Sequence, residues 1–265
     1  ANSQTDLVIW KTDKDSSVPL KDTEFTIVPN EGSSFVDRSA SKAFVTDTTG
    51  KALPIDGSSS LTGQLIAGET YSIEESKAPA GYEKLPGQFK ITEAGTVEAV
   101  GTVPAGWTIA DGGALIVAKD TPIEVVLNKK STSGIDVANA TYRISGKFRG
   151  ADGQPQQDVR TYTTATTQAL TGAVKVEGLI GGETYTIKET ASPAGYVLDG
   201  TEFTFTVKDD GTVVAGSSGQ TAANGAAAMS QDSHRNVGYS IANRDTVTIT
   251  QTDAPIRLSL AKRGS

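Results

Sequence analysis

Two glutamates, Glu75 and Glu189, stand where the strand pattern aims them at a protein core. Each lies in one copy of a repeated segment, residues 71–82 and 185–196, and the two copies align without a gap. Side chains alternate between the two faces of a strand, so each glutamate shares its face with the tyrosine and the isoleucine that precede it. Burying an ionised carboxylate costs on the order of several kcal/mol unless it is paired or protonated. The repeat therefore singles out both glutamates as candidates for acid chemistry.

Length and composition indicate the kind of chain that must position these acids. The 265 residues correspond to about two domains at roughly 150 residues each. Glycine is frequent, with 28 residues, and no segment shows the long apolar period of a helix. These features favour an all-β chain with many turns. The net charge of −7 argues against binding nucleic acid through its phosphates and mainly favours solubility.

The residue types that are missing exclude several classes of site. The chain contains no cysteine, which excludes disulfides, thiol nucleophiles and thiolate metal sites. The single histidine, His234, does not favour a metal site, and we expect neither a metal ion nor a cofactor. No apolar run approaches the roughly 20 residues of a membrane helix, so we expect no membrane insertion of this segment. No signal peptide or anchor is visible, and we expect a fragment of a longer protein.

The order of strand-like segments is itself repeated, which predicts two tandem β-sandwich domains. We place them at residues 1–130 and 131–265, joined by a short connection near Lys129–Lys130. Three pairs of segments match between the halves: 24–27 with 141–144, 106–110 with 238–242, and 121–128 with 254–261. We assign the last pair as the final strand of each domain.

The repeated pattern Tyr-x-Ile-x-Glu-x-x-x-Pro-x-Gly-Tyr resembles the E-box of CnaB-type (collagen-adhesin B-type, SpaA-like) domains, and the resemblance covers nearly the whole chain. Such domains are immunoglobulin-like modules of Gram-positive collagen adhesins and sortase-assembled pilins. The resemblance implies two tandem immunoglobulin-like β-sandwiches. It also implies a spontaneous isopeptide bond between a lysine of the first strand and an asparagine of the last strand, promoted by the E-box glutamate.

In the first unit the resemblance assigns these roles to Lys11, Glu75 and Asn128. Lys11 is in phase with Leu7 and Ile9 on the first strand, and Asn128 ends the segment taken as the last strand. Burial favours the neutral forms of amines and carboxyl groups. A neutral lysine amine would attack the Asn128 side-chain carbonyl, Glu75 would donate a proton, and ammonia would leave. The alternative is an ordinary, partly exposed Lys11–Glu75 pair with Asn128 in a turn.

In the second unit Glu189 keeps the motif, and Lys129 or Lys130 could supply the amine. The position matched to Asn128 is Ala261, whose side chain has no acyl group. We therefore predict no Lys–Asn bond in this unit, and we expect the buried Glu189 to keep its proton to an unusually high pH. Two nearby residues remain as alternative acceptors, Asn243 and Asp253.

These inferences predict a structural module of a Gram-positive cell-surface protein, either a pilin subunit or an adhesin stalk. We expect it outside the cell, on the cell wall or pilus, with other pilin subunits or the cell wall as partners joined by a sortase. Its chemistry is a single self-directed turnover, so we do not expect an enzyme. The alternative is an adhesive module for a host matrix protein or glycan, with the small-residue insert 215–237 as candidate binding loop.

Overall fold

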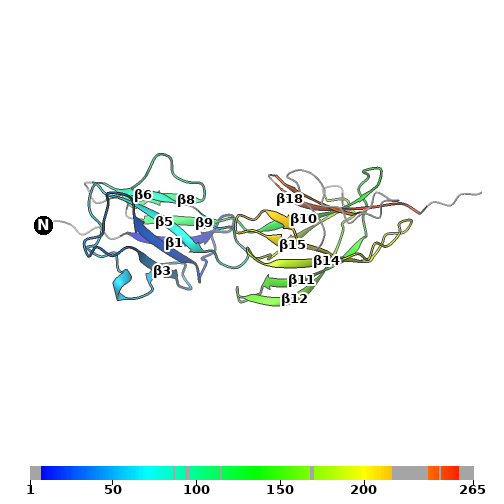
Figure 1. Cartoon of the computed structure of the whole chain (residues 1–265), viewed down its shortest axis with the longest axis horizontal. Coiled ribbons are helices and arrows are strands. Elements are labelled where there is room, and N and C mark those ends of the chain that lie inside the picture. The colour runs from blue at the N-terminus through cyan, green and yellow to red at the C-terminus, as the bar shows by residue number, and fades with distance from the viewer. Residues whose placement is uncertain are drawn as a thin grey trace, which may run out of the picture. The chain divides into compact units, whose positions relative to one another are not determined.

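The computed structural model describes residues 7–85, 87–92, 96–113, 115–167, 170–216, 238–244 and 246–256. The chain divides into two units, Ala1–Pro122 and Ile123–Ser265, and each unit has its own sheets (Figure 1). The expected fold, two tandem immunoglobulin-like β-sandwiches, is confirmed. We call these two parts unit 1 and unit 2.

The boundary between the units lies between Pro122 and Ile123, so the boundary expected after residue 130 is wrong. The alternating pattern of residues 124–131 identifies a strand, but it does not say which unit the strand joins. This strand is β10 (Glu124–Ser131), and its partners are β13 (Ala173–Glu177) and β18 (Val247–Asp253). Hydrogen bonding therefore makes β10 the first strand of unit 2.

Unit 1 packs a three-stranded sheet against a six-stranded sheet. The smaller sheet has the order β1 (Val8–Asp13), β9 (Leu115–Asp120), β8 (Trp107–Ala110). The larger sheet has the order β4 (Ala52–Pro54), β3 (Lys42–Thr46), β2 (Glu24–Pro29), β5 (Thr70–Lys77), β6 (Gln88–Ile91), β7 (Val97–Ala99). Two 3-10 turns accompany the strands, η1 (Gly57–Ser59) and η2 (Asp111–Gly113). Burial alternates along β1 and β9, so every second side chain faces the core.

Unit 2 repeats this arrangement with a four-stranded and a five-stranded sheet. The first has the order β13, β10, β18, β17 (Gly238–Asn243). The second has the order β12 (Pro155–Thr163), β11 (Thr141–Arg149), β14 (Thr184–Ala191), β15 (Phe203–Val207), β16 (Val213–Ala215). The repeated motif occupies β5 in unit 1 and β14 in unit 2.

In both units the first and the last strand lie side by side and run parallel, β1 with β9 and β10 with β18. Among the aligned residue pairs are Lys11 with Ala118, Asp13 with Asp120, Lys129 with Gln251, and Ser131 with Asp253. A lysine of the first strand is thus held next to the end of the last strand. This pairing, rather than either strand alone, creates the candidate sites.

The tyrosine that opens each motif copy is buried and fixes the loop before its strand. The Tyr71 hydroxyl donates to the Ser34 carbonyl at 2.8 Å and accepts from the Ile66 N–H at 3.0 Å. The Tyr185 hydroxyl accepts from the Ile180 N–H at 2.8 Å and donates to the Lys147 carbonyl. Both hydroxyls are therefore satisfied inside a core, where an unpaired one would be costly.

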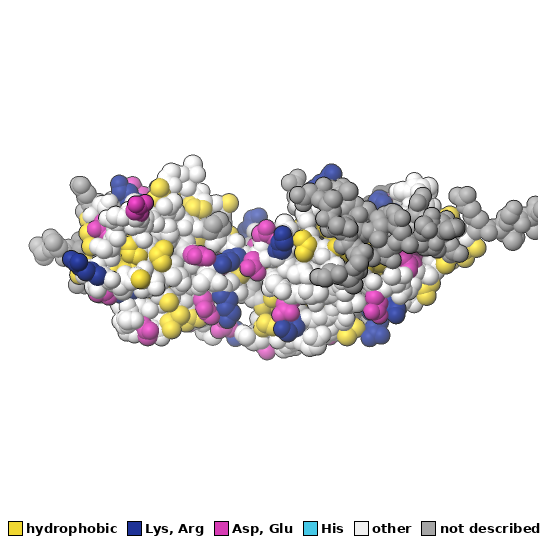
Figure 2. Space-filling view, viewed as in Figure 1, with side chains coloured by type: hydrophobic (Ala, Val, Ile, Leu, Met, Phe, Trp, Pro, Cys, Tyr) yellow, Lys and Arg dark blue, Asp and Glu magenta, His cyan; other side chains and the backbone are white. Residues whose placement is uncertain are grey.

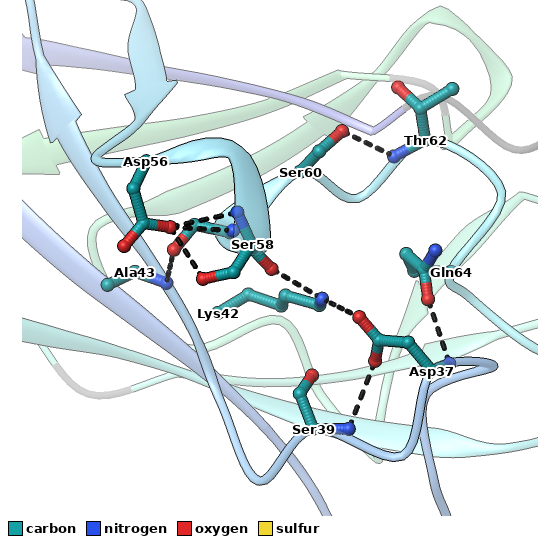
Figure 3. A network of polar contacts seen from close by, with 10 residues as sticks. Asp37, Ser39, Lys42, Ala43, Asp56, Ser58, Ser60, Thr62 and Gln64 are labelled. Atoms are coloured by element: carbon teal, nitrogen blue, oxygen red, sulfur yellow. Dashed lines mark hydrogen bonds and ion pairs between the residues drawn. The ribbon is translucent and has the colours of Figure 1, made fainter.

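A polar network ties together the loops on one side of unit 1 (Figure 3). The Lys42 ammonium bonds Asp37 Oδ2 at 2.5 Å and the Ser58 carbonyl at 2.6 Å. The Asp56 carboxylate caps η1 by accepting from the Ser58 and Ser59 N–H groups at 3.0 Å each. Side-chain capping of this kind satisfies backbone donors that the short helix leaves free.

The face seen in Figure 2 carries acidic, basic and apolar side chains interspersed with other polar ones. Several exposed pairs bridge neighbouring strands, such as Lys175 with Glu124 at 2.8 Å. Exposed pairs of this kind contribute little to stability. Among the residues that the structure describes, no helix is long and apolar enough to cross a membrane.

Candidate cross-linking sites

In unit 1 three ionisable side chains meet in the core, and all three are fully buried. Lys11 Nζ lies 3.0 Å from Glu75 Oε1 and directly contacts Asp120 Oδ1. Lys11 comes from β1, Glu75 from β5 in the opposite sheet, and Asp120 from the end of β9. The predicted inward aim of Lys11 and Glu75 is confirmed, because both have 0% exposure.

Unit 2 contains the same arrangement. Lys129 Nζ lies 2.9 Å from Glu189 Oε1 and 2.5 Å from Asp253 Oδ2. The three side chains come from β10, β14 and β18, which correspond to β1, β5 and β9 of unit 1. All three residues are at most 1% exposed. We call these two clusters the unit 1 triad and the unit 2 triad.

The Pro-Ala-Gly-Tyr segment of each motif orients its glutamate. Tyr82 N–H donates to the Pro79 carbonyl at 3.1 Å, and Gly81 has a φ of 89°. A turn with a positive φ at its third residue is a type II turn, which favours glycine there. The chain then returns past the motif strand, and the Leu85 N–H donates to Glu75 Oε2 at 2.8 Å. One oxygen of Glu75 is thereby anchored, while the other faces Lys11.

The second copy of the turn makes the same contacts. Tyr196 N–H donates to the Pro193 carbonyl at 3.1 Å, and Gly195 also has a φ of 89°. The Asp199 N–H then donates to Glu189 Oε2 at 3.1 Å. The spacing of the motif is explained by this geometry, because the turn must return a backbone N–H to the glutamate.

A β-bulge follows each glutamate. In unit 1 Phe25 of β2 is opposite Glu75, but the preceding Glu24 is opposite Lys77, so the register shifts between them. The β11–β14 pair shows the same shift next to Glu189. Bulges often lie beside functional sites, where they re-aim a side chain.

Burial sets the protonation of the four carboxyl groups. It raises the pKa of Glu75, and it raises the pKa of Asp120 to about 8, although Lys11 opposes both shifts. Burial raises the pKa of Glu189 to about 7, and it also raises the pKa of Asp253. Lys129 opposes both shifts. Each triad has two acids for one lysine, so one retained proton removes the excess buried negative charge. The expectation that Glu189 holds its proton to a high pH agrees with its raised pKa.

The assignment of Asn128 as the partner of Lys11 is wrong. Asn128 lies on β10, opposite Ala173 and Thr250 in a sheet of unit 2, and its side chain is on the less buried face. The residue that meets Lys11 is Asp120. The error arose because the apolar alternation of residues 123–127 is equally compatible with the last strand of one unit and the first strand of the next.

The candidates in the second unit separate in the same way. Lys129 belongs to the triad, whereas Lys130 points outward and pairs with Asp136 at 2.5 Å. Of the alternative acceptors, Asp253 lies in the triad. Asn243 instead exchanges two 2.8 Å hydrogen bonds with the Val213 backbone. Ala261 lies outside the described residues.

A signal for the two aspartates of the triads is present in the sequence. Asp120-Thr-Pro-Ile123 and Asp253-Ala-Pro-Ile256 share the pattern Asp-x-Pro-Ile. In each unit the proline after the aspartate forms a bridge with the tyrosine that ends the motif, Pro122 with Tyr82 and Pro255 with Tyr196. The pattern therefore marks the point where the last strand reaches the turn of the motif.

Trp107 is buried and packs its ring 5.4 Å from that of Phe89, which makes it a core residue. The described residues contain no cluster of acidic or histidine side chains arranged to hold a metal ion. His234 and residues 217–237 of the insert lie outside the described residues.

The Lys42–Asp37 pair of Figure 3 offers a contrast within unit 1. Lys42 is buried and Asp37 accepts from it, but Asp37 is 40% exposed. The hydrogen bond from Lys42 lowers the pKa of Asp37 to about 2, so this carboxylate stays ionised. No second acid is among the partners described for Lys42. A buried lysine beside an aspartate is therefore not sufficient to reproduce a triad.

The sequence matches the family model SpaA, described as a prealbumin-like fold domain, over residues 5–103 and 123–220. The chain therefore belongs to the SpaA prealbumin-like domain family, with one matched domain in each unit. The resemblance to CnaB-type, SpaA-like domains is confirmed. No curated protein matches the chain.

Several solved structures align with the chain at low identity. A C-terminal fragment of the pilus adhesin SpaC from Lactobacillus rhamnosus GG is 18% identical with a TM-score of 0.43, covering 98% of this chain and 100% of the fragment. The Bacillus anthracis TIE protein is 19% identical with a TM-score of 0.36, covering 96% of this chain and 34% of that protein. A point mutant of the shaft pilin spaA from L. rhamnosus GG is 18% identical with a TM-score of 0.34, covering 97% of this chain and 100% of the pilin chain.

Proposed function

We propose that the chain is a structural segment of a Gram-positive surface protein, a pilin subunit or an adhesin stalk, and that each unit closes an internal Lys–Asp isopeptide bond. The observation that carries the proposal is the triad, which occurs twice with the same strand origins. In both copies a fully buried lysine lies between a glutamate and an aspartate. The acceptor is an aspartate in each unit, in place of the asparagine expected from the resemblance.

The reaction needs no component from outside the triad. The aspartate keeps its proton, and a second proton moves from the lysine ammonium to the ionised glutamate, which gives a neutral amine beside two carboxylic acids. The lysine nitrogen then attacks Cγ of the aspartate, and the nitrogen–carbon bond forms. The hydroxyl of the acid leaves with one amine proton, so one water is released for each bond. The neighbouring glutamate relays that proton, and the fold supplies proximity in place of strong activation.

The bond joins the first strand to the last within each unit. In unit 1 it would close a loop across a separation of 109 residues. By analogy with disulfide loop closure, such a link adds about 4–5 kcal/mol to the free energy of unfolding, in a model whose mechanism is disputed. Unlike a disulfide, an amide does not depend on the redox state of its surroundings. That property suits an extracellular chain without cysteine.

The proposed partners are other pilin subunits or the cell wall, linked by a sortase through sequence outside the triads. Adhesion to a host matrix protein or glycan through the 215–237 insert has no supporting observation among the described residues. The cross-links formed in the triads would bear mechanical load wherever in the protein adhesion takes place. The chemistry is a single turnover in each unit and makes no product beyond water.

Intact-mass measurement of the purified chain tests the proposal. We expect the mass to be lower than the sequence mass by two waters, and peptide mapping to recover Lys11 joined to Asp120 and Lys129 joined to Asp253. Glu75→Ala should restore one water and lower the melting temperature, because the unit 1 reaction loses its proton relay.

The matched control is Glu74→Ala. Glu74 is the neighbouring residue on β5, but its side chain is 64% exposed and pairs with Lys84 at 3.4 Å. This variant should keep both bonds. An unshifted mass in the unaltered chain would refute the cross-links, and a loss of ammonia would refute aspartate as the acceptor.

A further inference from the structure

The surroundings of the two lysines differ between the triads. The register places Ala118 opposite Lys11 in unit 1 and Gln251 opposite Lys129 in unit 2. Gln251 is fully buried, and its Oε1 accepts from Lys129 Nζ at 2.7 Å. Since Gln251 and Asp253 are two residues apart on β18, both side chains lie on the same face as the reacting groups.

A tyrosine holds Gln251 in this orientation. The Tyr142 hydroxyl donates to Gln251 Oε1 at 2.5 Å, and the matching position in unit 1 is Phe25, which has no hydroxyl. Both Tyr142 and Lys129 are donors here, so the amide must present its oxygen to them. The Gln251 Nε2 group has no hydrogen-bond partner among the described residues. A buried donor left in this state is costly, which indicates that the contact with Lys129 is specific.

The consequence is a difference in how the two amines are held. Lys129 Nζ forms ion pairs with Glu189 and Asp253 and also donates a hydrogen bond to Gln251. Gln251 therefore adds a neutral acceptor to the two carboxylates that hold the ammonium, whose three N–H groups are all donors. Within the described part of unit 1, the polar contacts of Lys11 Nζ are with the two carboxylates alone. Both lysines face an aromatic ring, Lys11 that of Phe25 at 5.7 Å and Lys129 that of Tyr142 at 5.9 Å.

We propose that Gln251, held by Tyr142, is a positioning residue that delays bond formation in unit 2 relative to unit 1. This inference rests on the proposed function. The Lys129 nitrogen must release a proton and turn its lone pair toward Cγ of Asp253, and the hydrogen bond to Gln251 opposes both movements. The bond that forms and the water that leaves are the same as in unit 1. Unit 1 therefore closes first, and unit 2 remains open for longer after folding.

The test follows both bonds in the same molecules. The chain is made by cell-free synthesis, synthesis is stopped, and samples are quenched in acid from the time when unit 1 is only partly cross-linked. After digestion, the Lys11–Asp120 and Lys129–Asp253 peptides are quantified by mass spectrometry. We expect the unit 2 bond to form about tenfold more slowly, a difference that corresponds to about 1.4 kcal/mol in activation free energy.

Two variants with opposite expected effects separate positioning from packing. Gln251→Leu combined with Tyr142→Phe removes the acceptor and its holder together, and should bring the unit 2 rate close to that of unit 1. Gln251→Glu keeps the length of the side chain, adds a charged acceptor for Lys129, and should slow the reaction further. A purely structural disturbance would change the rate of the unit 2 bond in the same direction in both variants.

Unit 1 provides the reciprocal variant and the internal standard. Ala118→Gln with Phe25→Tyr should slow the Lys11–Asp120 bond and leave unit 2 unchanged, which tests the idea even if the unit 2 variants fold poorly. Equal rates in the unaltered chain, or acceleration by Gln251→Glu, would overturn the proposal. If neither unit ever forms a bond, the proposed function itself fails, whereas a unit 1 bond with an unhindered unit 2 bond refutes only the role of Gln251.

Discussion

At the scale of single residues, the triads combine features that a stable protein normally avoids. Two carboxyl groups and one lysine share a site without water exposure, and burial raises the pKa of Glu75, Asp120, Glu189 and Asp253. An acid that keeps its proton near neutral pH serves as a proton donor and as an acyl acceptor. The Lys42–Asp37 pair lacks these features, because its acid is partly exposed and its pKa is lowered.

The pKa values predict how bond formation depends on pH. A carboxylic acid loses its proton as the pH rises through its pKa, and an ionised aspartate is a poor acyl acceptor. Burial raises the pKa of the acceptor Asp120 to about 8, so the rate in unit 1 should fall above about pH 8 as the acceptor ionises. Burial raises the pKa of the relay acid Glu189 to about 7, so the rate in unit 2 should fall above about pH 7 as the relay loses its proton. Folding freshly synthesised chain at a series of pH values and quantifying both cross-linked peptides tests this. A rate that still climbs through pH 9 in both units would contradict it.

At the scale of elements, the turn of the motif positions the glutamate. Gly195 has a φ of 89°, and a Cβ at this position would meet nothing within 4 Å. A non-glycine residue there is therefore strained only through its backbone, by about 1–2 kcal/mol. Relaxing that strain would move the Asp199 N–H away from Glu189 Oε2, where it now donates at 3.1 Å.

We expect Gly195→Ala to lower the melting temperature and also to slow the bond in unit 2. The matched control is Gly182→Ala in the same unit. Gly182 has a φ of 82°, and the atom nearest to an added Cβ would lie 3.9 Å away. It carries a similar strain but lies before the motif strand. Differential scanning calorimetry and peptide mapping should show similar thermal shifts for both variants and slower cross-linking only for Gly195→Ala. Equal cross-linking rates in the two variants would show that the turn of the motif does not influence bond formation.

At the scale of the whole molecule, each unit would be a closed covalent loop. The cross-link joins β1 to β9 and β10 to β18, which are the strands that enter and leave each unit. A pulling force transmitted along the chain would then pass through the bond and leave the core unloaded. This arrangement fits a stalk, where resistance to extension matters more than recognition.

Stretching single molecules tests the load-bearing role. The unaltered chain, held at both ends, should extend without releasing residues 11–120 or 129–253. Glu75→Ala should release the 11–120 segment at a measurable force, because only hydrogen bonds and packing then hold it, while unit 2 stays closed. Release of both segments from the unaltered chain would contradict a stalk built on these bonds.

Much of the fold and part of each site follow from local patterns. The alternation along residues 71–75 predicts that Tyr71, Ile73 and Glu75 share the buried face, and β5 confirms it. The phase of Lys11 with Ile9 is confirmed in the same way. These predictions succeed because the period of a strand is a local property of the backbone.

The sequence by itself determined the all-β class, the duplication, the two glutamates and the lysine of unit 1. Tertiary structure decided which strand closes each unit, and hence that Asp120 and Asp253 are the partners of Lys11 and Lys129. The physical reason is that the first and last strands of a unit are far apart in the sequence. Only the hydrogen bonds between them in the folded unit bring them together. An alternating segment carries no record of which neighbour it will bond, so β10 could be assigned to its unit only from its pairing.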